Sequence, residues 1–146
     1  QKYTSREIAI LTAKYFEVEM NRNNQSNFLI FEGFKQHGDD IIKEAQEYIE
    51  QHFEEKLVIE DLCGRYPYSR RTFQRKFKQA THYTVVEYIQ KVRMEAAKKQ
   101  LEQGEETVQE IMYAVGYSDP KAFRDVFKKN AGCTPLQYRK KYSVLY

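Results

Sequence analysis

The stretch SRRTFQRKFKQA, residues 69 to 80, combines two patterns in one segment. Phe73, Phe77 and Ala80 recur at the spacing of a helix face that packs into a core. The same twelve residues hold five cations and no carboxylate, namely Arg70, Arg71, Arg75, Lys76 and Lys78. A half-buried helix with so much unbalanced positive charge indicates either a solvated basic face or a negatively charged partner.

The same pattern recurs about 50 residues later, and this recurrence predicts an internal repeat. At an offset of 49 the pairs are Ile59 with Val108, Leu62 with Ile111, Tyr66 with Val115, Tyr68 with Tyr117, and Ser69 with Ser118. After one extra residue the pairs are Phe73 with Phe123, Phe77 with Phe127, Lys78 with Lys128, Thr84 with Thr134, and Tyr88 with Tyr138. Each copy reads as a short helix, a tight turn, a capped basic helix and a Thr that starts a third helix. Two helices joined by a short turn, the second one basic, form a helix-turn-helix, so the sequence predicts two such units.

Helix start and stop signals surround the two copies. Asp39 and Asp40 suit the N-terminus of a helix that carries an apolar stripe to Phe53. The longest helical pattern covers residues 84–103 and ends at Gly104. Upstream, a helix is expected at about 5–18 and an apolar strand or extended strip at 28–34.

Composition and charge narrow the class of protein. The chain has 146 residues and a net charge of +3, but residues 1–56 carry a net −4 and residues 57–146 a net +7. A basic half beside an acidic one is typical of a nucleic-acid-binding module attached to something else. No apolar run could span a bilayer, and the two cysteines, Cys63 and Cys133, fit a reducing cytoplasm. Because the first residue is Gln1, the sequence is expected to be a piece of a longer protein.

The repeat explains the basic helix if its partner is duplex DNA. Phe73 and Phe77 would anchor it, while Arg71 and Gln74 face the major groove, where Arg suits guanine and Gln suits adenine. A helical module that binds an acidic protein, and a helical RNA binder, are the alternatives. No nucleophile elbow, phosphate-binding glycine loop or metalloprotease motif is present, so an enzyme is not expected. His37, His52 and His82 have no ligand-like spacing, so neither a metal site nor a cofactor is expected.

The segment from about Asp39 to Tyr142 resembles the DNA-binding domain of AraC/XylS-type bacterial transcriptional regulators. The resemblance rests on IMYAVGYSDPKAFRDVFKKNAGCTPLQYR (111–139) and on YIQKVRMEAAKKQL (88–101), which is similar to the linker-helix pattern of that family. It implies an all-α, homeodomain-like fold of about seven helices. Two helix-turn-helix subdomains (57–82 and 107–132) would be joined by a long linker helix (84–103) and followed by a C-terminal helix (134–142).

The resemblance also implies residue roles. Base contacts would come from Arg70, Arg71, Gln74, Arg75, Pro120, Lys121, Ala122 and Asp125. Phosphate contacts would come from Ser69, Lys78, Ser118, Arg124, Lys128, Lys129 and Arg139. Asp125 departs from the family pattern, in which Arg is common, so the first unit is expected to supply most of the base readout. His82 aligns with Gly132 at a helix end, where a positive φ is expected.

The N-terminal part loosely resembles the junction in a subgroup whose sensor domain is similar to class I glutamine amidotransferases. Residues 1–37 would then be the tail of that sensor plus a linker, and residues 38–146 the DNA-binding domain. Partners expected on this basis are double-stranded promoter DNA and RNA polymerase, with any dimerisation through the missing N-terminal domain. The expected function is regulation of transcription in the bacterial cytoplasm, with no contact with a membrane.

Overall fold

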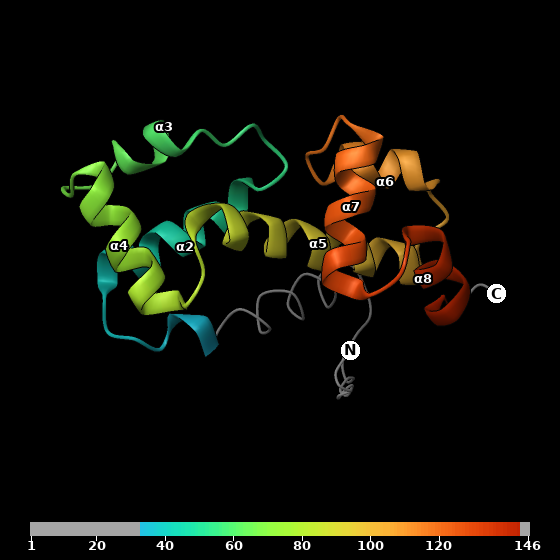
Figure 1. Cartoon of the computed structure of the whole chain (residues 1–146), viewed down its shortest axis with the longest axis horizontal. Coiled ribbons are helices and arrows are strands. Elements are labelled where there is room, and N and C mark those ends of the chain that lie inside the picture. Colours follow the sequence, from blue (N-terminus) through green and yellow to red (C-terminus); the bar gives the residue numbers. More distant parts are fainter. Residues whose placement is uncertain (1–32, 144–146) are drawn as a thin grey trace. The chain divides into compact units, whose positions relative to one another are not determined.

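The computed structural model describes residues 33–143, which contain one short 3₁₀-helix and seven α-helices (Figure 1). The elements are η1 (Gly33–Lys35), α2 (Asp40–His52), α3 (Ile59–Cys63), α4 (Arg70–Thr81), α5 (Val85–Gln103), α6 (Val108–Ala114), α7 (Pro120–Ala131) and α8 (Pro135–Tyr142). Within residues 33–143 there is no β-strand, as expected for an all-α protein. The helix expected at 5–18 and most of the apolar strip at 28–34 lie outside the described residues, and the end of that strip is helical in η1 rather than extended.

Side-chain caps fix where the helices start. Thr84, Thr107 and Thr134 each begin a helix with a reciprocal capping box, in which the threonine hydroxyl accepts from a backbone N–H three residues on and the side chain there accepts from the threonine N–H. Asp39 caps α2 and Ser69 caps α4. In α7, however, the cap is Asp119, with Pro120 in the first turn, so Ser118 is not the counterpart of Ser69 that the repeat predicted.

Within the described part of the chain, residues 37–143 form one compact unit, in which α5 is the central element. The first helix-turn-helix unit (α3 and α4) packs with α2 against the N-terminal half of α5. The second unit (α6 and α7) packs with α8 against the C-terminal half, so that α4 and α7 lie beside opposite halves of α5 (Figure 1). The linker helix was predicted at 84–103 and observed at Val85–Gln103 with Thr84 as its cap.

The aromatic packing repeats as closely as the sequence does. Phe77 meets Tyr88 edge-on at 5.4 Å between ring centroids, and Phe127 meets Tyr138 edge-on at 5.5 Å. The two phenylalanines of each helix are also similarly placed, with centroids 5.9 Å apart in α4 and 6.0 Å apart in α7. The same ring geometry in both units confirms that the pairs at an offset of 50 are structural equivalents.

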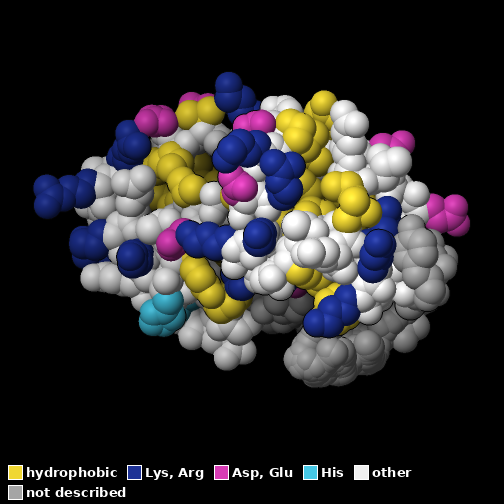
Figure 2. Space-filling model, turned by 45° about the vertical axis from the view of Figure 1, so that its right-hand side comes forward, with side chains coloured by type: hydrophobic (Ala, Val, Ile, Leu, Met, Phe, Trp, Pro, Cys, Tyr) yellow, Lys and Arg dark blue, Asp and Glu magenta, His cyan; other side chains and the backbone are white. Residues whose placement is uncertain are grey.

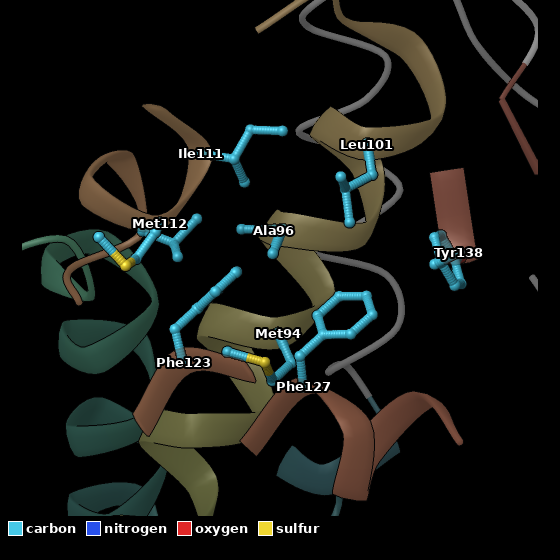
Figure 3. Packing of buried hydrophobic residues seen from close by; sticks show 10 residues of the cluster. Met94, Ala96, Leu101, Ile111, Met112, Phe123, Phe127 and Tyr138 are labelled. Atoms are coloured by element: carbon cyan, nitrogen blue, oxygen red, sulfur yellow. The ribbon is translucent and has the colours of Figure 1, made fainter. Parts of the chain in front are cut away.

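The second unit closes around a core to which four helices contribute (Figure 3). Met94, Ala96 and Leu101 come from α5, and Phe123 and Phe127 come from α7. The remaining labelled members of this core are Ile111 and Met112 of α6 and Tyr138 of α8. Tyr138 also donates a hydrogen bond to Glu102 on α5, and burial beside this carboxylate raises the pKa of the phenol. The core therefore fixes one face of α7 and leaves its other face free.

Helix α4 ends in a strained residue, as the repeat predicted. His82 adopts a left-handed conformation with φ of 69°, and its equivalent Gly132 has φ of 81°. A side chain with a Cβ disfavours this region, whereas glycine adopts it freely.

Replacing His82 with Gly should therefore stabilise the protein by about 0.5–1 kcal/mol, because the relief of strain exceeds the extra entropy of the unfolded glycine. Urea unfolding measures this. Gly132→Ala is the matched control, since a Cβ there meets nothing within 4 Å and only the backbone strain remains; it should destabilise by a similar amount. If His82→Gly did not stabilise the protein and Gly132→Ala did not destabilise it, the idea that residue 82 is strained would be contradicted.

Candidate nucleic-acid interface

Helix α4 buries one face and exposes a basic one. Phe73, Phe77 and Thr81 are buried at helical spacing. About a third of a turn away, the exposed side chains of Arg71, Arg75 and Lys78 share a face with the partly exposed Gln74. The core thus holds the helix by one side and presents four polar side chains, three of them cationic, on the other.

Arg70 does not belong to this basic face. It begins α4 about 100° around the helix from Arg71, on the side that faces α3, and its guanidinium lies 2.6 Å from the Glu60 carboxylate. The sequence pattern showed no carboxylate partner for Arg70, because Glu60 lies outside residues 69–80 and on another helix. Both side chains are more than half exposed, so the pair itself contributes little stability.

Helix α7 repeats the arrangement with a different charge balance. Phe123 and Phe127 are buried, while Lys121, Arg124, Asp125 and Lys128 are exposed at positions equivalent to Arg71, Gln74, Arg75 and Lys78. Lys121 donates a hydrogen bond to Asp125 over 2.9 Å, and this contact lowers the pKa of the Asp125 carboxyl, which is therefore charged at neutral pH. One cation on this face is thus already paired within the helix.

Arg124 occupies the place in α7 that Gln74 occupies in α4. From the sequence, Arg124 was predicted to contact phosphates and not bases. The offset of 50 that pairs Phe73 with Phe123 also pairs Gln74 with Arg124, so the signal was present in the repeat.

The remaining predicted contact residues lie at the starts of α4 and α7 and at the end of α7. Pro120 is exposed in the first turn of α7, and Ala122 is partly exposed behind it. Ser69 and Ser118 are exposed beside the starts of α4 and α7, but Ser69 Oγ already accepts from the Thr72 N–H over 3.2 Å. Lys129 is exposed in the last turn of α7.

Arg139 is buried, which corrects its prediction as a phosphate contact. Only 7% of the residue is exposed, and its Nε donates to the Leu101 carbonyl at 3.3 Å. The carbonyls of the last turn of a helix lack partners within the helix, and an Arg side chain satisfies one of them while its stem packs against apolar surface. Arg139 therefore ties α8 to the end of α5 and does not reach the surface.

A shallow groove lies beside each basic helix, at the start of the following helix. Beside α4 it has a volume of about 490 Å³ and is lined by Ile59, Gln74, Arg75, Lys78, Gln79, Thr84, Val85 and Val86. Beside α7 it has a volume of about 520 Å³ and is lined by Val108, Gln109, Met112, Pro120, Phe123, Arg124, Thr134, Pro135 and Leu136. Five pairs of equivalent positions recur in both linings, namely Ile59 and Val108, Gln74 and Arg124, Thr84 and Thr134, Val85 and Pro135, and Val86 and Leu136. This part of the surface therefore repeats as well as the core.

Figure 2 shows Lys and Arg side chains spread over one face of the molecule, with Asp and Glu between them. No group of three or more His, Cys, Asp or Glu side chains within residues 33–143 is arranged to hold a metal ion. None of the helices in that range is long and apolar enough to cross a membrane.

The family model described as "Helix-turn-helix domain" matches residues 62–141, more than half of the chain and nearly all of the two units described above. The chain belongs to the AraC-type helix-turn-helix family. Its all-helical fold, with two units joined by α5, is that of the family. The family consists of DNA-binding domains of transcription regulators. The outward faces of α4 and α7 are therefore the candidate DNA-binding surfaces.

Curated relatives from bacteria share this domain. The chain is 42% identical over 96 residues to the bifunctional transcriptional activator/DNA repair enzyme AdaA of Bacillus subtilis, covering 64% of this chain and 44% of AdaA. It is 32% identical over 99 residues to the regulatory protein SoxS of Salmonella typhimurium, covering 68% of this chain and 92% of SoxS. The chain thus spans less than half of AdaA but nearly all of SoxS.

Among solved structures, the DNA-binding domain of the global transcriptional factor AdpA was determined in complex with a target DNA. It superposes on this chain with a TM-score of 0.66 at 30% identity, covering 69% of this chain and 91% of that one. An AraC-type domain of the same fold therefore binds DNA.

Proposed function

We propose that this chain is the DNA-binding part of a bacterial transcription regulator and reads two elements of a promoter, one with α4 and one with α7. The observation that carries the proposal is the paired geometry. Each of these helices is held by two buried phenylalanines and turns an exposed polar face away from the core. The AdpA domain, which shares the fold and was solved with its target DNA, supports duplex DNA as the partner.

The length of α5 suits this role. Its 19 residues give a helix of about 28 Å at 1.5 Å per residue. Successive major grooves on one face of B-DNA are about 34 Å apart. A helix of this length, with one unit packed beside each half, brings the two basic helices within reach of neighbouring grooves. A single chain could then bind an asymmetric site without a two-fold axis.

We assign the roles as follows, after removing the two residues that the structure directs elsewhere. Base readers in the first unit are Arg71, Gln74 and Arg75. In the second unit the residues facing the bases are Pro120, Lys121, Ala122, Arg124 and Asp125. Phosphate contacts fall to Ser69, Lys78, Ser118, Lys128 and Lys129. Arg70 and Arg139 are left out because the first pairs with Glu60 and the second is buried.

The two units should contribute unequally to sequence discrimination. Replacing Arg71 and Gln74 together with Ala should cost about 2–6 kcal/mol of discrimination against a wrong base, since a bidentate contact contributes about 1–3 kcal/mol. Lys121→Ala should cost less than about 1 kcal/mol, because Lys121 is engaged with Asp125 on an exposed surface. Competition binding against single-base variants of the bound site measures both. Equal losses would contradict the inequality between the units.

For the whole protein, we further propose that residues 1–37 are the end of a sensor domain similar to class I glutamine amidotransferases, followed by a linker. Residues 38–146 would be the DNA-binding domain. That sensor would bind the effector and supply any dimerisation. Activation of a promoter would require contact with RNA polymerase, and a regulator of chromosomal promoters would act in the cytoplasm. The support for the sensor is the sequence resemblance of the N-terminal segment alone.

Selection of bound sites from a pool of random duplexes at about 0.15 M salt tests the proposed function. Enrichment of two short elements whose centres lie about one helical turn apart, or about 10 base pairs, is the expected result. Binding without enrichment would mean that the basic faces are an electrostatic patch only. Enrichment of a single element would mean that one unit reads DNA alone.

A further inference from the structure

Arg93 lies near the middle of α5 and contacts the segment between α2 and α3, on the side of the first unit. Its Nε donates to the Phe53 carbonyl and its Nη2 donates to the Glu55 carbonyl, each over 2.8 Å. Both carbonyls belong to the connection between α2 and α3. The planar guanidinium is suited to such a two-pronged contact because its donors are fixed relative to one another.

The same guanidinium contacts the turn of the second unit. Its Cζ lies 5.4 Å from the centre of the Tyr117 ring, a cation–π distance. The neighbouring Gly116 has φ of 103°, and a Cβ built there would lie 3.0 Å from Arg93 Cζ and 3.0 Å from the Phe53 carbonyl oxygen. The backbone of the α6–α7 turn therefore approaches both Arg93 and the α2–α3 connection as closely as a residue without a side chain permits.

Hydrophobic contacts at the same place also join the segment after α2 to the second unit. Phe53, which follows α2, packs against the core cluster of the second unit, as does Tyr117. In Figure 1 the connection between α2 and α3 reaches over α5 toward the α6–α7 turn. Burial here lowers the pKa of the Arg93 guanidinium and raises that of the Tyr117 phenol, as expected where water is partly excluded. The α2–α3 connection and the α6–α7 turn thus meet around the Arg93 side chain.

We propose that Phe53, Glu55, Arg93, Gly116 and Tyr117 form a joint that fixes α4 relative to α7 and so makes the protein discriminate the spacing between its two DNA elements. This rests on the proposed function. One added base pair moves the second element by about 3.4 Å and rotates it by about 35° around the duplex. A rigid protein can follow only if the DNA deforms, whereas a protein that pivots about α5 can follow without that cost.

Arg93→Met tests the joint, because it keeps most of the length of the side chain and removes both donors and the charge. Arg93→Lys keeps the charge without the fork. Lys91→Met, on the same helix, is the matched control: it also removes one cation, and the ring that Lys91 approaches, Tyr83, lies in the connection between α4 and α5 and not in the second unit. The probes are the duplex selected by the unaltered protein, the same duplex with one base pair inserted or deleted between the elements, and duplexes holding one element.

For the unaltered protein and Lys91→Met, a change of one base pair should weaken binding by about tenfold or more, the effect of about 1.4 kcal/mol of DNA deformation. For Arg93→Met this ratio should fall to about threefold or less, with Arg93→Lys in between, while affinity for single-element duplexes changes by less than about twofold. Unchanged single-element binding shows that both units still fold. A spacing ratio equal to that of the unaltered protein would overturn the proposal.

A measurement without DNA separates failure of the joint from failure of the proposed function. Spin labels at Gln79→Cys and Lys129→Cys, two exposed positions on α4 and α7, report the distance between these helices once Cys63 and Cys133 are replaced by Ala and Ser. A narrow distance distribution that Arg93→Met broadens supports the joint even if selection finds no two-element site. Equal distributions for both proteins would overturn it even if such a site is found.

Discussion

Phe127→Ala should unfold the second helix-turn-helix unit under conditions in which the unaltered protein is stable. Phe127 has no exposed surface and lies at the centre of the second core, with ring centroids 6.0 Å from Phe123 and 5.5 Å from Tyr138. Truncation of a buried Phe costs about 3–5 kcal/mol, because contacts are lost and a cavity remains. Domains of this size have only about 5–15 kcal/mol of stability, so the loss would be a large part of it.

Urea unfolding followed by circular dichroism measures the change, with Lys129→Ala as the control on the exposed face of the same helix. The control should stay within about 0.5 kcal/mol of the unaltered protein. The equivalent variant Phe77→Ala should show a loss similar to that of Phe127→Ala, because its ring meets Tyr88 in the same geometry. A loss below about 1 kcal/mol for Phe127→Ala would contradict the packing described for the second core.

DNA binding should fall steeply with salt. Three exposed cations on the outer faces of α4 and α7 are assigned to phosphates, namely Lys78, Lys128 and Lys129. Each neutralised phosphate releases condensed counterions, so three contacts predict a slope of about −3 in log K against log salt. Affinity should therefore drop by about 40-fold between 50 and 200 mM salt. Lys121 is not included because Asp125 already pairs with it.

Fluorescence anisotropy with a labelled duplex over this salt range measures the slope. Lys128→Ala should reduce its magnitude by about 1. Lys43→Ala, which removes an exposed cation from α2, should leave the slope unchanged. A slope shallower than about −1 for the unaltered protein would instead favour the alternative interpretation, a helical module whose basic surface binds an acidic protein.

The sequence by itself determined the local structure and the repeat. Spacing of apolar residues identified the buried face of each helix, since a period of 3.6 is a property of the segment alone. Thr84 and Thr134 marked helix starts because a cap acts within three or four residues. The paired phenylalanines of α4 and α7 revealed the two units, and the outward faces of these helices follow from the buried ones. The excess charge of the first basic helix indicates nucleic acid from the sequence alone.

Only the tertiary structure decided which polar groups meet across helices. Arg70 is turned to Glu60, and Arg139 is buried against the end of α5, although both were expected at the DNA surface. Arg93 had no predicted role at all, yet it contacts carbonyls 38 and 40 residues away. The physical reason is common to all three. The guanidinium of Arg ends a long, flexible and partly apolar stem, so its partner depends on which backbone or carboxylate the folded chain brings within reach.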